Sequence, residues 1–440
     1  MFRSFRMRGV LFFIGTTIAL LAMLVGIIAV KEPFQAHAHS ATNTLYVSHS
    51  PSGSDTSCAD PGYTSVQAAV DAASKGDTVY LCDTTPYTEQ VVITKAITLT
   101  GVNGATIQSP LVYPTNASRL PPQFTSDNLF LPQAIIVVWG AGSNASIVNL
   151  NITGPLPGNG SCADEEYGVL VIARGKATLQ GDHVTDIRDS NPALYGCQFG
   201  VAIQVGREYW PTANFSTFLV ENFVGHATIT KTTVTGYQKN GITVDGPGSG
   251  SNITKSTVKG AGRNTALGNI IAQNGIQISR GAAAMVESNF VADNSYTGTA
   301  PNASSGGILV FGGCGDPLSI GVEVEGNVLS NNDVGIYLNN YNAACTAPAS
   351  QKTYDKALNN TISNNAVTNM STFVDANGHT FAGYQAGIDD VGNNDLITRN
   401  TITGMGYTPA QTTPPGPFVI PIDTISFPTT HPRIRSNRII

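Results

Sequence analysis

The sequence predicts an all-β fold, a right-handed parallel β-helix (a solenoid of stacked coils) with a short N-terminal capping helix. A glycine followed by alternating apolar residues recurs along the chain, and a second motif that contains Asn recurs between these copies. Turn-forming residues are abundant, and glycine contributes 46 of the 440 residues. Motifs that recur every ~20–50 residues are typical of stacked supersecondary units, which is why we predict a solenoid.

The composition favours one elongated domain. Only 12% of the residues are charged, about half of the roughly 25% found in ordinary globular proteins. Turn-forming residues occur along the chain with few interruptions, so we expect a single β-helix over residues 45–405. Residues 406–440 form a Pro-rich C-terminal segment, in which the Asn437-Arg438-Ile439 motif predicts one last strand.

Residues 1–38 have the features of a signal peptide. Three arginines precede an apolar run at residues 10–30, and a small-x-small cleavage site ends at Ala38. The run is longer than usual, so the alternative is an uncleaved signal anchor that holds the protein at a membrane. Cleavage would change the net charge from −6 to −9, because four basic residues and one acidic residue would be lost. We therefore expect a secreted, extracellular monomer with no nucleic-acid partner and, after cleavage, no membrane partner.

Six cysteines in an exported chain predict three disulfides, although sequence alone allows fifteen pairings. Separations of 24, 35 and 31 residues are close to the spacing of the repeat, and they would place the two members of a pair on neighbouring coils. The pairs with these separations are Cys58–Cys82, Cys162–Cys197 and Cys314–Cys345. The alternative is six free buried thiols, which are unusual outside the cytosol.

One helix is expected, over residues 64–74, where Thr64 or Ser65 can cap its start. Four apolar residues share one helical face: Val66, Ala69, Val70 and Ala73. A solenoid must cover the open apolar end of its first coil, and this helix is the natural lid.

The main repeat is Gly followed by an apolar residue, any residue and a second apolar residue. Successive copies are 28 to 52 residues apart, and they begin at Gly168, Gly200, Gly241, Gly275, Gly307, Gly335 and, more weakly, Gly387. Period-two alternation predicts short strands with the two apolar residues facing inward. We expect three positions to face outward: the Gly, the residue between the two apolar residues, and the residue that follows the second apolar residue.

The second repeat is an Asn beside an apolar or β-branched residue, with copies at Asn289, Asn327, Asn360 and Asn400. Its phase implies a second short strand in each coil and a turn that contains the Asn. Asn tolerates left-handed backbone conformations, and equivalent Asn side chains on stacked coils can form a hydrogen-bonded ladder.

Residues 65–107 resemble the N-terminal coil of the pectin lyase-like superfamily. The shared features are the capping helix, a GDTV strand, a Tyr-x-Glu turn and the segment VITKAITLTG. The later Gly and Asn motifs are similar to the parallel β-helix repeats of many secreted members. The resemblance spans most of residues 64–405 and implies the fold strongly. It implies the chemistry weakly, since the superfamily includes lyases, hydrolases, esterases, epimerases and binding or adhesive proteins.

The outward face of the main repeat is where we expect a ligand. Its positions on successive coils are Thr243 and Asp245, Gln277 and Ser279, Leu309 and Phe311, Tyr337 and Asn339, then Asp389. Phe311 and Tyr337 could stack on sugar rings, while Gln277 and Asn339 hydrogen-bond hydroxyl groups. The alternative is a polar, solvated sheet face.

Candidate catalytic acids are Asp245, Asp389 and Asp390, because glycoside hydrolysis needs two carboxyl groups. Asp389 and Asp390 are adjacent, so on a strand they would point to opposite faces. If the strand breaks there, Asp389, Asp390 and Asp395 could instead bind Ca²⁺, the one cofactor that the sequence suggests. The alternative is that these residues cap turns.

A lyase would need a base, and Arg280 and Arg399 are the nearest candidates by position. Their alternative role is to pair with the Asp residues. Tyr209 and Trp210 follow the coil next to an acidic loop at residues 164–167 and could form a sugar subsite, or they could only hold their own loop in place.

The sequence therefore predicts a secreted protein that binds a polysaccharide or a cell-surface glycan and could degrade it as a lyase or glycoside hydrolase. The alternative is a non-catalytic extracellular β-helix with a glycan-binding, adhesive or structural role. Whether the chain is an enzyme is left open at this point. No HExxH, CxxC or phosphate-loop motif occurs to indicate another class of site.

Overall fold

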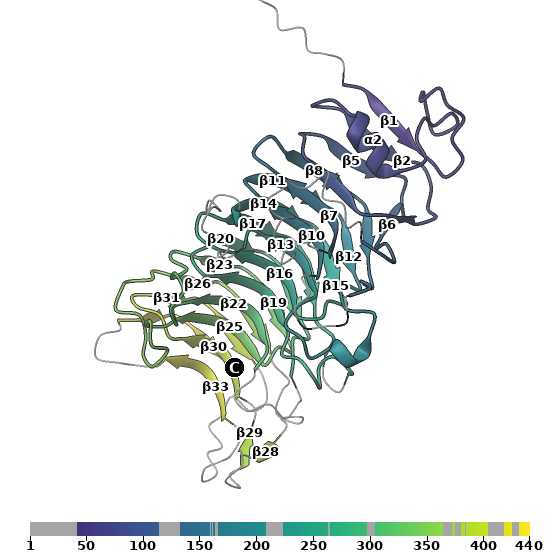
Figure 1. Ribbon diagram of the computed structural model, residues 1–440. Coiled ribbons are helices and arrows are strands. Elements are labelled where there is room, and N and C mark those ends of the chain that lie inside the picture. The colour runs from purple at the N-terminus through teal and green to yellow at the C-terminus, as the bar shows by residue number, and fades with distance from the viewer. Residues whose placement is uncertain are drawn as a thin grey trace, which may run out of the picture. The chain divides into compact units, whose positions relative to one another are not determined.

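The computed structural model describes residues 42–113, 133–158, 160, 162, 166–207, 223–262, 265–296, 304–363, 372–374, 380–382, 384–403, 418–424 and 431–440. Residues 43–440 form one compact unit, a right-handed parallel β-helix (Figure 1). The predicted signal peptide lies outside the described residues. Within the part of the chain that is described, no helix is long and apolar enough to cross a membrane.

Three parallel sheets run along the solenoid, and each complete coil contributes one strand to each sheet. Sheet 1 has twelve strands, in the order β1 (Thr44–Val47), β2 (Thr78–Leu81), β5 (Thr98–Gly101), β8 (Asn144–Val148), β11 (Gly175–Gln180), β14 (Gly225–Thr230), β17 (Gly250–Thr254), β20 (Ala283–Glu287), β23 (Glu323–Glu325), β26 (Lys356–Leu358), β31 (Leu396–Thr398) and β34 (Arg433–Arg435).

Sheet 2 follows sheet 1 in each coil after a tight turn. Its eleven strands are β3 (Tyr87–Thr88), β6 (Thr106–Gln108), β9 (Asn151–Thr153), β12 (His183–Thr185), β15 (Thr233–Thr235), β18 (Thr257–Lys259), β21 (Phe290–Ala292), β24 (Val328–Ser330), β27 (Thr361–Ser363), β32 (Thr401–Thr403) and β35 (Arg438–Ile439).

Sheet 3 carries the main glycine repeat. Its ten strands are β4 (Val91–Ile93), β7 (Gln133–Trp139), β10 (Glu166–Ile172), β13 (Val201–Val205), β16 (Asn240–Asp245), β19 (Asn274–Ser279), β22 (Gly306–Gly312), β25 (Val334–Asn340), β30 (Tyr384–Asp390) and β33 (Phe418–Thr424). Outside the three sheets, the described residues include an antiparallel hairpin, β28 (Thr372–Val374) with β29 (Thr380–Ala382), and a short 3₁₀ helix, η2 (Pro192–Leu194).

Stacked aliphatic side chains fill the interior. Each strand alternates, so that on β16 Ile242 and Val244 are fully buried inside the coil. The same inward positions on the next strand are Ile276 and Ile278, in register with them. Identical packing repeated from coil to coil is what makes the solenoid continuous.

The predicted lid is the helix α2 (Val66–Ala72), which begins at the Ser65 cap and lies at the N-terminal end of the solenoid (Figure 1). Its apolar face packs into the core. The carboxylate of Glu89 accepts hydrogen bonds from the first two helical N–H groups at 2.7 and 2.9 Å. Lys95 donates to three carbonyl oxygens at the other end, at 2.7 to 3.3 Å. The two charges match the helix dipole and satisfy backbone groups that a short helix leaves free.

The repeating glycine faces inward, not outward as predicted. A Cβ built on Gly241 would lie 2.5 Å from the carbonyl oxygen of Gly275 and 2.5 Å from Val258 Cγ1 in the core. A Cβ built on Gly275 would likewise lie too close to the carbonyl oxygen of Gly307 on the next coil. The motif therefore requires glycine because the bend into sheet 3 leaves no room for a side chain.

The copy at Gly200 is out of phase with the others. The register pairs Val201 with Asn240 and Ile203 with Ile242, so Ala202 occupies the place of Gly241. Gly200 instead adopts a left-handed conformation, with φ of 79°. The predicted phase is wrong at this one coil because the coil has Ala202 at the position of the repeating glycine, and the Gly200 motif lies two residues too early.

The predicted Asn ladder is confirmed at the turns between sheets 1 and 2. Asn289 donates from Nδ2 to Asn327 Oδ1 at 3.0 Å, and the same contact repeats from Asn327 to Asn360 and from Asn360 to Asn400. The left-handed residue, however, is the one before each ladder Asn, for example Ser288 with φ of 57°. The ladder Asn is buried and uses its side chain, while its neighbour makes the turn.

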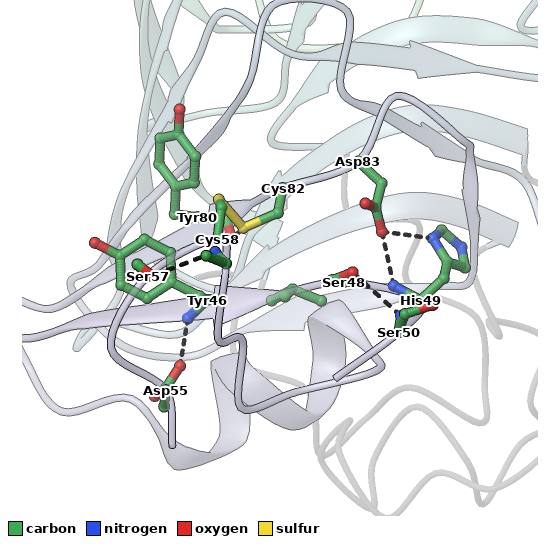
Figure 2. The surroundings of a disulfide bond; sticks show 12 residues. Tyr46, Ser48, His49, Ser50, Asp55, Ser57, Cys58, Tyr80, Cys82 and Asp83 are labelled. Carbon is green, nitrogen blue, oxygen red and sulfur yellow. Dashed lines mark hydrogen bonds and ion pairs between the residues drawn. A yellow bond between two sulfur atoms is a disulfide. The ribbon is translucent and has the colours of Figure 1, made fainter. Parts of the chain in front are cut away.

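All three predicted disulfides are present and join neighbouring coils. Figure 2 shows the first, in which Cys58 from the loop after β1 is bonded to Cys82 at the end of β2. Asp83 beside it accepts a hydrogen bond from the His49 N–H at 2.7 Å and lies 3.0 Å from the His49 ring. These contacts attach the first loop to the first two strands.

The coils continue past residue 405. Strand β33 pairs with β30, and β34 and β35 pair with β31 and β32. The C-terminal segment thus supplies one strand to each of the three sheets.

Candidate functional site

The outer face of sheet 3 gathers most of the predicted site residues. The register aligns one outward row as Gln204, Thr243, Gln277, Leu309, Tyr337, Asp389 and Asp423. The next outward row contains Asp245, Ser279, Phe311 and Asn339. The predicted alternation is therefore correct for these positions, and neighbouring residues of a row lie about 4.8 Å apart.

The first of two cavities on this face has a volume of about 300 Å³. Its lining is rich in charged and amide side chains: Glu166, Gln204, Arg207, Lys239, Asn240, Asp245, Gln277 and Arg280. Tyr167 and Phe199 add aromatic surface. This mixture suits a ligand with several hydroxyl groups.

Hydrogen bonds fix the floor of this first cavity. Asn240 and Asn274 both donate to Gln277 Oε1, at 3.0 and 3.2 Å. Gln277 donates to Ser279 Oγ at 3.0 Å, and Ser279 donates to Asp245 Oδ1 at 2.7 Å. The side chains are held in place before any ligand arrives, which lowers the entropic cost of binding.

Arg280 and Asp245, predicted as base and acid, are bound to each other. Arg280 donates from Nε to Oδ1 at 2.8 Å and from its terminal nitrogen to Oδ2 at 2.6 Å. The Asp245 side chain is only 1% exposed. This pairing matches the structural alternative that the sequence left open, and it disfavours both residues as free catalytic groups.

The second cavity, of about 400 Å³, continues along the same face over the later coils. Its lining is more apolar and aromatic: Ile270, Ile271, Tyr296, Leu309, Phe311 and Tyr337, with Asn274, Ser304 and Asn339. The predicted residues Phe311, Tyr337 and Asn339 are thus brought together here. Burial and, secondarily, the charge of Asp389 raise the pKa of Tyr337 well above its usual value, so the phenol stays a neutral donor.

Gln198 and Lys239 line both cavities, which therefore form one groove. We call the two cavities together the sheet 3 groove. The Lys239 ammonium donates to the carbonyl oxygen of Ala272 at 2.6 Å. Burial lowers the pKa of Lys239 to about 8. Sequence reasoning missed this residue, although it directly precedes the Asn240-Gly241 start of a repeat.

Asp389 and Asp390 point to opposite faces of β30, as predicted. Asp389 lies in the outward row beside Tyr337, and its partner on the next strand is Asp423. The two carboxylates therefore occupy paired positions on one face. Sequence reasoning missed Asp423 because its strand was assigned to the Pro-rich segment. The Ile-Asp pair that occurs both at Ile388-Asp389 and at Ile422-Asp423 could have indicated that the two segments are equivalent strands.

Asp390 is buried on the inner side with two other carboxyl groups, Asp355 and Asp395. Burial raises the pKa of Asp390 and of Asp355 well above the usual value, and the Asp395 charge raises both further. The three predicted calcium ligands are thus divided between two faces. Among the described residues, no three His, Cys, Asp or Glu side chains are grouped to hold a metal ion.

Three predicted site residues remain, Arg399, Tyr209 and Trp210. Arg399 lies at the turn between sheets 1 and 2 and donates to Asn359 Oδ1 at 2.8 Å, so the structure does not bring it to sheet 3. Tyr209 and Trp210 lie outside the described residues.

A larger hollow of about 560 Å³ lies on the outer face of sheet 1. Its described lining includes Lys176, His226, Asn252, Met285 and Glu323, but no Phe, Tyr or Trp. The sheet 3 groove is the better candidate because it combines aromatic surface with fixed amide and charged groups.

No protein-family model matches the chain, and no curated protein matches it in sequence. Solved structures do match. A GH136 lacto-N-biosidase from Eubacterium ramulus is 14% identical over 90% of this chain and 68% of its own, with a TM-score of 0.48.

Two other solved structures are an alginate lyase from Paenibacillus sp. and a polygalacturonase from Erwinia carotovora. The first is 13% identical over 90% of this chain and 99% of its own, and the second is 12% identical over 90% and 96%; both TM-scores are 0.34. Scores below 0.5 carry no information about activity. The three parallel sheets themselves make the chain a right-handed parallel β-helix, the architecture that its resemblance to the pectin lyase-like superfamily predicts.

Proposed function

We propose that the chain is an extracellular protein that binds a polysaccharide along the sheet 3 groove and hydrolyses it with Asp389 and Asp423. One observation carries this proposal. The groove and the pair of carboxylates, Asp389 and Asp423, lie along the same outer face of sheet 3.

The dimensions of the groove suit a glycan chain. Six consecutive strands, from β10 to β25, contribute lining residues. At about 4.8 Å per strand this is a track of roughly 24 Å, long enough for several sugar rings. Amide groups in one half can bind hydroxyls, and Phe311 and Tyr337 in the other half can stack on ring faces.

The carboxylate pair suits hydrolysis. Asp389 and Asp423 are paired on adjacent parallel strands, which places their Cα atoms about 4.8 Å apart. Carboxyl groups about 5 Å apart act as nucleophile and acid in retaining glycosidases. Glu166 and Asp245 are less suitable, because strand β13 lies between their strands and they lie at opposite ends of those strands.

The extracellular part of the proposal rests on the three disulfides and on the N-terminal sequence. Disulfides form and persist in oxidising compartments. Signal-peptide cleavage would be checked by N-terminal sequencing of the secreted protein.

The test incubates the protein with a panel of neutral and acidic polysaccharides and measures binding, reducing ends and absorbance at about 235 nm. We expect new reducing ends without unsaturated products. Asp389→Asn and Asp423→Asn should each abolish the reducing ends and leave binding intact, since hydrolysis needs both carboxyl groups. Glu287→Gln, which removes one negative charge from the outer face of sheet 1, is the control.

Each other outcome is informative. Binding without any product would support the non-catalytic glycan-binding alternative. Unsaturated products would indicate a lyase and remove the role of the carboxylate pair. Failure to bind any glycan would overturn the proposal.

A further inference from the structure

The point where the two cavities meet carries a cation without a counter-charge. In the described part of the chain, the Lys239 ammonium has one hydrogen-bond partner, the Ala272 carbonyl oxygen at 2.6 Å, and no ion pair. Lys239 is partly buried. An ammonium held away from water without a carboxylate is unfavourable, so an anion supplied by a ligand would be stabilised there.

The other charges of the first cavity leave this site positive. Its described lining contains three cations, Arg207, Lys239 and Arg280, and two anions, Glu166 and Asp245. Arg280 and Asp245 neutralise each other through two hydrogen bonds. Glu166 belongs to β10, two strands away from the Asn240 that follows Lys239. The remaining formal charge is positive, and Lys239 lies nearest to the second cavity because it lines both.

The second cavity has a different chemistry. Leu309, Phe311 and Tyr337 dominate its floor, and no described lining residue other than Lys239 carries a positive charge. The groove therefore offers an anion-binding position and, directly beside it, an aromatic position for an uncharged ring face.

We infer that the ligand of the sheet 3 groove is an acidic glycan, whose carboxylate or sulfate group pairs with Lys239 while a neighbouring sugar ring lies over Phe311 and Tyr337. This inference rests on the proposed function and names its substrate class. The overall negative charge of the chain does not oppose it, because charges more than about 8 Å away are largely screened at physiological ionic strength.

The test measures binding of three hexasaccharides by titration calorimetry: hexagalacturonate, a sulfated hexasaccharide and cellohexaose. Asp389→Asn is used throughout so that no ligand is consumed. We expect at least one acidic hexasaccharide to bind about tenfold more tightly than cellohexaose, since one charge-assisted hydrogen bond is worth roughly one factor of ten or more. The affinities of the two acidic hexasaccharides are then compared, and the tighter one shows whether the site prefers a carboxylate or a sulfate.

Lys239→Gln should remove the preference for the acidic ligand, because it weakens binding of the acidic hexasaccharide about tenfold and changes the affinity for cellohexaose far less. Lys176→Gln makes the same charge change on the outer face of sheet 1 and should leave the preference intact. The preference should also fall as the pH rises through about 8, because the amine then loses its proton. Glu166, Arg207, Asp245 and Arg280 are the other charged groups of the cavity, and a pH effect that does not come from Lys239 should persist in Lys239→Gln.

The outcomes separate this inference from the proposed function. Equal affinities for acidic and neutral hexasaccharides, or a preference that survives in Lys239→Gln, would overturn the acidic-glycan inference and leave glycan binding standing. Absence of binding to all three, together with a negative polysaccharide panel, would overturn both.

Discussion

Arg280 and Asp245 form a two-bond salt bridge across adjacent coils of sheet 3, with nitrogen–oxygen distances of 2.8 and 2.6 Å. The carboxylate is almost completely buried and also accepts from Ser279. The pair closes the end of the hydrogen-bonded floor that begins at Asn240. The pair lines the first cavity, but its contacts are those of a structural element.

Arg280→Ala should therefore destabilise the protein. Removal of the guanidinium takes two charge-assisted hydrogen bonds from a buried carboxylate, and we expect a loss of about 2–3 kcal/mol in the free energy of unfolding, measured with urea at pH 7. Arg280→Lys keeps the charge without the two-bond geometry and should lose less. A lyase activity lost in Arg280→Ala with unchanged stability would instead indicate a catalytic base.

Asn327→Ala should interrupt the ladder between sheets 1 and 2. Asn327 is fully buried, accepts two hydrogen bonds from Asn289 and donates to Val286 and Asn360. The unsatisfied groups left behind should lower the free energy of unfolding by about 3 kcal/mol. Asn252→Ala, at an exposed position on sheet 1, should change stability by less than about 0.5 kcal/mol. Equal effects of the two substitutions would contradict the ladder's role.

Gly275→Ala tests the inward glycine position. The new methyl group would lie 2.5 Å from Val291 Cγ1 and 2.6 Å from the Gly307 carbonyl oxygen, so the coils must separate locally. We expect a loss of about 3 kcal/mol, observed as a lower urea midpoint. The control is Gly142→Ala, where the nearest atom is 3.6 Å away. That change should be neutral or slightly stabilising.

The raised pKa of the buried Asp182 carboxyl group should make the free energy of unfolding depend on pH. Burial raises its pKa to about 7, although it accepts hydrogen bonds from the Leu150 and Gln180 N–H groups, both at 2.9 Å. Between pH ~4 and 7 the unfolded chain loses this proton while the folded chain keeps it, so the free energy of unfolding falls as the pH rises. Below and above this range the contribution is constant.

Asp182→Asn should abolish that component. The amide cannot accept both N–H groups, which gives a constant penalty at every pH. Relative to the wild type, however, the variant should gain stability steadily from pH 4 to 7, in urea unfolding at several pH values. A difference between the two proteins that does not vary with pH would show that Asp182 ionises normally.

The sequence by itself determined the repeating unit. The period-two alternation fixed which aliphatic residues fill the core, the helical spacing fixed the lid, and the repeat length selected the disulfide partners. It also placed Gln277, Phe311, Tyr337 and Asn339 on one outer face, since a parallel register preserves the face from coil to coil. These features depend on local backbone geometry that repeats at every coil.

Only the tertiary structure decided the remaining features, because they depend on contacts between coils joined by loops of unequal length. The repeating Gly faces inward because the next coil's carbonyl group leaves no room, and Gly200 is out of phase with this column. Asp389 meets Asp423 across a segment that looks Pro-rich in sequence. Lys239 has no ion-pair partner among the described residues and lies where the two cavities join. The pattern specifies the coil, and packing between coils specifies the site.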